Sequence, residues 1–389
     1  MRVLYLALQQ EFPAPHAGFS HVYSVIKGLR KLGHEVIVVC KASKKEDIGR
    51  WKKYDGFEVL STAWHLDYFP PTVNRPYERI SQLLSVEIFR ASAKLKKIVE
   101  EKKIDIIHER HDMRFDISGL VSKLSGVPSV LEVNSPFLEE CFGERSVGYK
   151  LRNLTRRASF NLASAVVVQT GILKNIIDKN TYVNSRVIKN GADPEMFCPR
   201  EKDYETLGLE SLKGSIVVGF SGAFKPWHGV DVLVEASKGL DVKLLLIGGK
   251  MELSNGLAVG AIPHEEVPKY LNICDILVAP FAPSKDEKRK EMYKKYGMWW
   301  CPLKIFEYMA MSKPVISSRV GEVPEYIEGA GLTYEEGDIE GLRDAIEKLS
   351  KDEGLRARLG KKGREKVLEY YSWDKVARDT ERLYKELVG

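Results

Sequence analysis

Residues 301–327, which read CPLKIFEYMAMSKPVISSRVGEVPEYI, decide the fold of the second half of the chain. Pro302 favours the start of a helix, because its fixed φ and missing N–H cost nothing there. Apolar residues then recur at helical spacing, at Ile305, Phe306, Met309 and Ala310. Lys313-Pro314 ends the helix, and Val315–Ser318 follows as a short buried strand.

Two charged residues of this helix lie off its apolar face. Lys304 lies at its start, and Glu307 follows one turn later near the positive end of the helix dipole. A helix N-terminus that carries a lysine is a good site for a phosphate group. The stretch therefore predicts an anion site at the start of the helix.

Outward from this stretch, strands and helices alternate along most of the chain. Near-continuous apolar strands indicate burial on both faces, as in a parallel sheet. The strands expected in the first half are Val3–Leu8, Val36–Cys40, Ile104–His108, Val127–Asn134, Val166–Gln169 and Arg186–Ile188. Residues 41–80 read as irregular, and a long helix is expected from about Pro76 to Lys103.

The pattern of the first forty residues repeats after a polar segment at 199–214, which we interpret as a hinge. Ile216–Phe220, Val230–Leu240 and Val242–Ile247 give strand, helix and strand again. The sequence thus predicts an α/β protein with two Rossmann-like doubly wound domains. We expect the first domain at 1–200, the second at 201–370, and a C-terminal helix at 371–389 capped by Ser372 or Asp374.

Composition excludes several protein classes. The 389 residues, 44% of them hydrophobic, are too many for one ordinary core. No long apolar run or signal-peptide layout is present, so we expect a cytoplasmic protein. The five scattered cysteines predict buried thiols without a disulfide framework or structural zinc site. A charged fraction of 29% with few Gln residues leans toward a thermophilic source.

Positive charge is concentrated in the first half. Residues 1–200 hold 31 Lys and Arg against 22 Asp and Glu, whereas the remainder holds 29 against 32. A basic half attracts anionic partners, and residues 148–163 read as a basic amphipathic helix. We expect peripheral association with the anionic inner membrane face and no nucleic-acid partner, although a solvated surface fits the charge equally well.

Several ligand-binding motifs are absent from the sequence. It contains no GxGxxG after a strand, no GxxxxGK[ST], no HExxH and no DxD. Glycines and cations instead follow the strands, where doubly wound sheets bind ligands. The residues concerned are Gly18, Gly222, Lys225, His228, Gly248 and Lys304. They predict a site for a diphosphate that needs no metal.

Together these segments resemble the retaining, nucleotide-sugar-dependent glycosyltransferases of family four (group 1), which have the GT-B fold. The matching segments include GFSHVYSVIKGLRKLGHEVIVV, LEVNSP, IKNGADPEMF, VVGFSGAFKPWHGVDVLVEA, GAIPHEEVPKYLNICDILVAPF and PLKIFEYMAMSKPVISSRVGEVPEYI. Their order and spacing cover nearly the whole chain. The resemblance implies two domains that face across a cleft and a closing helix that returns to the first.

The resemblance also implies roles for individual residues. Glu307 would bind the ribose hydroxyls, and Ile262-Pro263 would face the base. Lys304, Lys225 and the backbone near Gly18 and Gly222 would hold the diphosphate of a UDP- or GDP-sugar, used as co-substrate without a further cofactor. Glu325 would orient the backbone that binds the sugar, or else cap a helix.

Two departures from the family pattern concern the donor. Where the family places the first acid of a glutamate pair, eight residues before Glu307, this chain has Trp299. Glu291 or Asp286, in the charged insertion 282–300 that we expect to form a flap, would then read the donor sugar. In the phosphate loop the usual Arg and Lys positions are Ala223 and His228, and Lys225 is the substitute.

A second group of candidates follows the strand at 104–108. His108, Glu109, Arg110 and His111 are placed to contact donor sugar or acceptor, and we select His108 and Arg110 as catalytic. The alternative is a salt-bridged strand end. A metal cluster is disfavoured because suitably spaced ligands are lacking. His21, near Gly18, fits a capping or solvent-facing role better than a place in the site.

The expected function is retaining, metal-independent transfer of a sugar from a nucleotide diphosphate to an unknown acceptor, phosphorylated or lipid-linked. An oxocarbenium-like transition state would form without a pair of carboxylates. Two alternatives stay open at this point. One is a nucleotide-sugar binding protein without activity, which Trp299 favours, and the other is a sugar-nucleotide epimerase.

Overall fold

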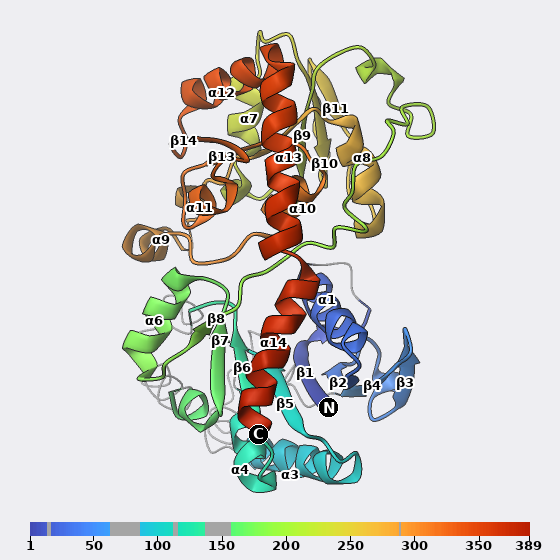
Figure 1. The fold of residues 1–389 in the computed structure, drawn as a ribbon, viewed down its shortest axis with the longest axis vertical. Helices are drawn as coiled ribbons and strands as arrows, with labels where there is room; N and C mark the ends of the chain where they lie inside the picture. The colour runs from blue at the N-terminus through green and yellow to red at the C-terminus, as the bar shows by residue number, and fades with distance from the viewer. Residues whose placement is uncertain (14–16, 63–85, 112–115, 137–156, 288) are drawn as a thin grey trace, which may run out of the picture. The chain divides into compact units, whose positions relative to one another are not determined.

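A computed structural model describes residues 1–13, 17–62, 86–111, 116–136, 157–287 and 289–389 (Figure 1). The chain divides into two compact units, each built on one sheet. The first comprises Met1–Lys189 with Val376–Gly389, and the second comprises Asn190–Lys375. Most of the predicted helix at 148–163 and the first part of the one at 76–103 lie outside the described residues.

The sheet of the first unit has eight strands in the order β3-β4-β2-β1-β5-β6-β7-β8. All neighbouring pairs are parallel except β3 with β4. Its strands are β1 (Arg2–Glu11), β2 (Glu35–Lys41), β3 (Trp51–Tyr54), β4 (Phe57–Thr62), β5 (Ile106–Arg110), β6 (Ser129–Val133), β7 (Ala165–Val168) and β8 (Arg186–Val187). The β3–β4 hairpin lies in the segment expected to be irregular.

Five described α-helices belong wholly or mainly to this unit: α1 (Ala17–Lys31), α3 (Val86–Glu101), α4 (Ser118–Ser125), α6 (Gly171–Thr181) and α14 (Trp373–Val388). Alternate residues of β1 face opposite sides of the sheet. Leu4 and Leu6 join a core with Leu95 of α3 and Val121 of α4. On the other side lies a polar network, described below, that reaches α1 and α14.

The sheet of the second unit has six parallel strands in the order β11-β10-β9-β12-β13-β14. They are β9 (Val217–Ser221), β10 (Lys243–Ile247), β11 (Gly256–Ala258), β12 (Ile276–Ala279), β13 (Val315–Ser318) and β14 (Gly331–Tyr334). Its described α-helices are α7 (Val230–Ala236), α8 (Val267–Ile273), α9 (Lys290–Tyr296), α10 (Leu303–Ala310), α11 (Val323–Ile327), α12 (Ile339–Lys351) and α13 (Glu353–Tyr370).

An apolar cluster packs on each face of this second sheet. One joins Leu277 to residues of α8, α10 and α13, such as Leu271, Phe306 and Val367. The other joins the opposite face of the sheet to α7 and α12. Both sheets therefore have helices on both faces, which confirms the prediction of two Rossmann-like doubly wound domains.

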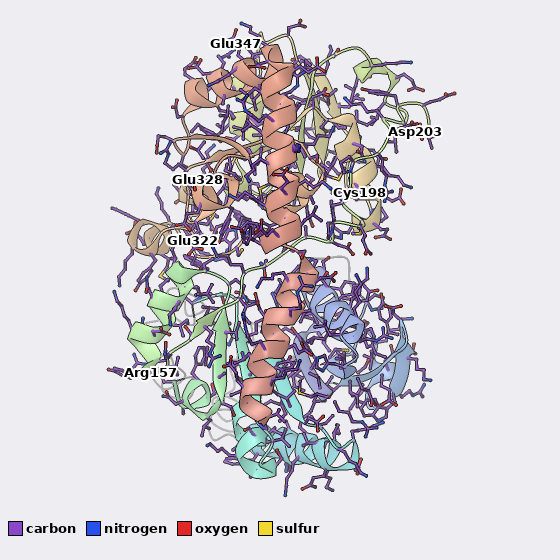
Figure 2. The ribbon with its side chains drawn as sticks, in the orientation of Figure 1. Arg157, Cys198, Asp203, Glu322, Glu328 and Glu347 are labelled. Carbon is purple, nitrogen blue, oxygen red and sulfur yellow. The ribbon has the colours of Figure 1, made fainter. Side chains whose placement is uncertain are left out.

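The segment at 199–214, expected to be a hinge, packs in the second unit. Leu209 and Leu212 are buried in its core, and Arg200 N donates to Asn272 Oδ1 of α8 at 2.8 Å. Figure 2 labels Asp203 on this segment and Cys198 just before it, where Asn272 Nδ2 of α8 donates to Cys198 O at 3.4 Å. The units meet in sequence at 189/190, ahead of the expected 200/201, because these apolar residues have their partners in the second core.

The C-terminal helix starts two residues later than expected. Helix α14 begins at Trp373 and Ser372 Oγ accepts from Lys375 N at 3.2 Å, as expected for a cap. The insertion expected to form a flap contains α9 and a buried aromatic contact.

The described cysteines carry free thiols, with Cys40, Cys274 and Cys301 buried and Cys198 partly exposed. Among the described helices, none is long and apolar enough to cross a bilayer.

Candidate functional site

Helix α10 begins after Pro302, as its sequence predicts, and buries the expected apolar face. Lys304 lies in its first turn, close to the loop that follows β9. Its Nζ lies 4.1 Å from the ring centroid of Phe220 and 5.4 Å from that of Phe281. Within the described part of the chain, this buried nitrogen has no hydrogen-bond partner. Burial lowers the pKa of Lys304 to about 7, although Glu307 opposes the shift.

Glu307, one turn along α10, is buried and bound to a residue that the sequence did not single out. Its Oε1 lies 2.9 Å from Nε2 of His264. Partial burial lowers the pKa of His264, but the Glu307 carboxylate outweighs it, so the net shift is upward. His264 opens the short helix η5 (His264–Glu266) directly after Ile262-Pro263, the pair expected to face the base. Through His264, the structure therefore brings Glu307 close to the predicted Ile262-Pro263 pair.

The glycines after β9 and β10 fit against each other. Gly222 has φ +137°, Gly248 has φ +111°, and a Cβ on Gly248 would lie 2.4 Å from Gly222 O. Gly222 N donates to Ile247 O and Gly248 N to Gly260 O. Because both amides are already bonded, these glycines provide space and a tight turn, whereas we had expected their N–H groups to be accessible.

The remaining predicted residues of this loop differ in exposure. Lys225 is exposed, whereas His228 ends the short helix η4 (Pro226–His228) and is partly buried. Its Nδ1 contacts Ala223 O. Burial, and then the nearby Lys304 ammonium, lower the pKa of His228 to about 4. His228 is thus neutral near neutral pH.

Trp299 lies in an aromatic cluster. It is 3% exposed and stacks on Tyr293 of α9 with ring centroids 4.6 Å apart. Asp286 is buried and pairs with Arg289 at 3.2 Å, whereas Glu291 is exposed. The insertion packs beside the phosphate loop, since Arg289 lies 6.0 Å over the ring of Trp227.

Glu325 is exposed on α11. Glu322 and Glu328 flank this helix at its two ends (Figure 2), and Glu322 accepts a hydrogen bond from Tyr326 OH at 2.8 Å. The backbone oxygens of Glu325 and Glu328 accept from Lys366 Nζ. Lys366 therefore holds the end of α11 in place, and the predicted role of the Glu325 side chain stays a prediction.

In the first unit, His108 lies inside β5, which extends to Arg110, two residues beyond the expected end. His108 is 2% exposed and stacks on Tyr5. Its Nε2 lies 3.2 Å from Glu132 Oε2, and its Nδ1 lies 2.6 Å from Tyr384 OH of α14. Because an ionised Glu132 can only accept, Nε2 carries the proton and Tyr384 donates to Nδ1.

Glu132, in β6, is the centre of this network, although we did not select it from the sequence. It accepts from Arg110 at 3.0 Å and Gln169 at 3.1 Å, and lies 2.6 Å from His21 of α1. Burial alone would raise the pKa of Glu132, but His21, His108 and Arg110 outweigh burial and hold it well below its usual range.

Burial also lowers the pKa of His21 despite its contact with Glu132. Arg110, which is always protonated, is therefore the permanent counter-charge of the carboxylate. The solvent-facing or capping role expected for His21 is wrong, because the side chain is buried beside Glu132. The sequence signal that could have pointed to Glu132 is an acidic residue between two apolar residues inside an expected strand, in LEV at 131–133.

A cavity of about 10 Å³ adjoins the network and is lined by His21, His108, Glu132, Gln169, Lys189 and Thr380, among others. That volume suits roughly one water molecule. Gly18, in the first turn of α1, lies against the side chain of Gln10, since a Cβ there would meet Gln10 Oε1 at 2.6 Å. In the described residues that buried oxygen has no hydrogen-bond partner.

Glu109 and His111 take structural roles beside this network. Glu109 accepts from the backbone N–H groups of Ile117 and Ser118 at the start of α4. Burial, and then the neighbouring Asp116, raise the pKa of Glu109 to about 8. His111 Nδ1 lies 2.9 Å from Asp116. In the described part of the chain, no group of three or more His, Cys, Asp or Glu side chains could hold a metal ion.

Comparison with known proteins identifies the family. The model for glycosyl transferases group 1 matches residues 215–352, and that for glycosyltransferase family 4 matches residues 19–196. An uncharacterized glycosyltransferase of Methanocaldococcus jannaschii is 31% identical over 308 residues, which cover 75% of this chain and 78% of the relative. The chain belongs to the group 1 glycosyltransferases of family 4.

Solved structures agree on the fold of this glycosyltransferase. The sucrose-phosphate synthase of Thermosynechococcus elongatus matches 99% of this chain and 98% of its own, with a TM-score of 0.74 and 20% identity. Anabaena HepE in complex with UDP matches both chains over their full length, with a TM-score of 0.71 and 16% identity. Family membership makes the chain a transferase, which decides against the inactive binding protein and the epimerase.

Proposed function

We propose that this glycosyltransferase transfers a sugar with retention, and without a metal ion, from a nucleotide-diphosphate sugar to a hydroxyl of an anionic acceptor. The observation that carries the proposal is the buried Nζ of Lys304 at the start of α10, next to Gly222, because no described residue is its hydrogen-bond partner. Burying such an amine is costly in the ligand-free protein, so its retention points to an anionic ligand.

The proposed donor is bound through two groups on α10. Lys304 and the N-terminus of α10 bind the diphosphate, with His228 and Lys225 beside them. Glu307, held by His264, accepts hydrogen bonds from the ribose hydroxyls, and Ile262-Pro263 lies against the base. The solved structures of HepE with UDP and with UDP-glucose support a nucleotide sugar as the donor, and we propose a UDP- or GDP-sugar.

In the proposed reaction the bond from the sugar C1 to the diphosphate oxygen breaks while the acceptor oxygen bonds to C1 on the same face. The leaving diphosphate carries away the electron pair of the broken bond and takes up the proton that the acceptor hydroxyl loses. Lys304 stabilises the negative charge that develops on that diphosphate, which replaces the role a metal ion would have. His108 and Arg110 of the first unit are the proposed contacts to sugar or acceptor.

The acceptor class rests on charge. The first 200 residues carry nine more positive than negative side chains, which suits a phosphorylated or lipid-linked acceptor and peripheral attachment to an anionic membrane surface.

The test is a transfer and hydrolysis assay with a panel of UDP- and GDP-sugars in the presence of a chelator. We expect turnover of at least one donor, retention of the anomeric configuration by proton NMR, and a loss of about 100-fold or more for Glu307→Ala. Glu347→Ala is the matched control, because Glu347 lies on α12, exposed and paired with Lys351 (Figure 2). Undiminished turnover by Glu307→Ala would overturn the site assignment, and inverted product would overturn the mechanism.

A further inference from the structure

Burial, rather than any neighbouring charge, is what disfavours the charged form of Lys304. The rings of Phe220 and Phe281 lie against Nζ. The titratable groups that interact with Lys304 are Glu307 of its own helix and His228 of the loop after β9, which in turn feels the charge of the exposed Lys225. Glu307 is itself committed to His264 at 2.9 Å. Among the described residues, Nζ therefore has no hydrogen-bond partner to stabilise its charge.

Two basic groups border the position that a side chain on residue 222 would occupy. A Cβ on Gly222 would lie 2.8 Å from Lys304 Nζ and 3.6 Å from His228 Cε1. The absence of a side chain at this position thus leaves two basic groups bordering the same space. His228 directs Nδ1 to Ala223 O, so its neutral form carries the proton there and presents a lone pair on Nε2.

We propose that the donor diphosphate enters this site together with a proton from solvent, which Lys304 takes up, so that donor affinity falls as the pH rises above neutrality. The inference rests on the proposed function, because it assumes that the ligand is a diphosphate. An anion in contact with Nζ supplies a counter-charge and favours the ammonium form. His228 is the second group that the anion would protonate, at lower pH.

The direction and size of the effect follow from linkage. With the pKa of Lys304 at about 7 in the empty site, the amine is largely neutral at higher pH. Binding then takes up about one proton near pH 8.5 and about 0.1 near pH 6, because the bound form is protonated throughout. The dissociation constant should rise about 50-fold from pH 7 to pH 9, approaching tenfold per pH unit.

The experiment is isothermal titration of the full chain with UDP-glucose and, in parallel, GDP-mannose, in pairs of buffers with different ionisation enthalpies. A nucleotide sugar is preferable to free UDP, whose terminal phosphate itself titrates near pH 6 (roughly). Binding with no proton uptake between about pH 7.5 and pH 9 would overturn this inference and leave the donor site standing. Absence of binding by both donors at every pH would overturn the donor site and, with it, the inference.

Lys304→Arg identifies the group that takes up the proton. Arginine stays protonated in proteins, so the variant should bind with proton uptake near zero at about pH 8.5 and with a flat pH profile. Lys362→Arg, on the exposed side of α13, is the control and should keep the wild-type uptake. Uptake unchanged in Lys304→Arg would assign the proton to another group and overturn the role of Lys304. If that variant does not bind, the wild-type pH profile still decides, since a flat affinity from pH 7 to 9 contradicts the proposal.

Discussion

Gly222 leaves no room for a side chain beside Lys304, since a Cβ there would lie 2.8 Å from Nζ. The atom that would be displaced is the end of a flexible lysine, so the protein can still fold around the substitution. The cost falls on the position of Nζ, which the donor site depends on.

Gly222→Ala should therefore weaken UDP-glucose binding about tenfold or more, because Nζ is pushed out of place. The backbone at φ +137° adds strain of about 1–3 kcal/mol. Gly239→Ala is the control for strain alone, since Gly239 has φ +76° in the same unit with nothing within 4 Å of its Cβ position. Calorimetry and urea unfolding on both variants separate the two effects, and equal donor affinity in the two would contradict the placement of the site.

Lys304→Met should stabilise the empty protein while it weakens donor binding. Methionine keeps the apolar stem and removes a buried amine whose pKa is lowered to about 7. The gain in unfolding free energy should be about 1–2 kcal/mol at neutral pH. Between the lowered pKa of the folded state and the ordinary pKa of lysine, Lys304 carries a proton in the unfolded chain that it lacks in the folded protein. The wild type therefore gains stability as the pH rises through this range. In urea unfolding, the difference in unfolding free energy between Lys304→Met and the wild type should thus shrink toward alkaline pH. A variant that is less stable than the wild type at neutral pH would contradict this prediction.

Tyr384→Phe should cost about 1–3 kcal/mol of unfolding free energy, because it leaves Nδ1 of buried His108 without its donor. Tyr182→Phe is the matched control: Tyr182 is 89% exposed, so the loss of its hydroxyl should stay within about 0.5 kcal/mol. Equal stability of the two variants by urea unfolding would show that the Tyr384–His108 contact contributes nothing.

The network around Glu132 should make the first unit sensitive to acid. The pKa of Glu132 is lower in the folded protein than in the unfolded chain. Glu132 therefore contributes to stability above its ordinary pKa, and this contribution is lost as the pH falls from that value to the lower folded-state pKa. His21, also depressed, acts in the same direction below its own ordinary pKa. Unfolding measured from about pH 7.5 down to about pH 3 should show falling stability, first through His21 and then through Glu132. Glu132→Gln should be less stable at neutral pH with a flatter profile, and parallel profiles would contradict the assignment.

Much of the fold could be predicted from local pattern. The strands β9, β10, β12 and β13 are short apolar runs between glycines or prolines, and each lies within two residues of its expected position. The β3–β4 hairpin could not be predicted, because its partly exposed β3, WKKY, carries no apolar alternation. The unit boundary was displaced because polar spacing, rather than the buried Leu209 and Leu212, guided the interpretation.

The site could be predicted only in part, for a related reason. Lys304 and Gly222 follow from the rule that ligands bind at helix starts and strand ends, which local sequence reveals. His264, Glu132 and Tyr384 depend on partners 43, 24 and 276 residues away in their respective contacts, which a linear pattern does not carry. The expected free N–H groups of Gly222 and Gly248 were already bonded, which only the packed loops reveal.

The central claim is that Lys304 and the start of α10 bind the diphosphate of the donor. The most direct measurement is calorimetric titration of UDP-glucose and GDP-mannose into the wild type, Lys304→Met and the surface control Lys362→Met at about pH 6.5, where the wild-type lysine is largely protonated. The account predicts that Lys304→Met binds at least about 30-fold more weakly than the wild type for whichever donor binds, while Lys362→Met matches the wild type. Equal affinity of Lys304→Met and the wild type would contradict it.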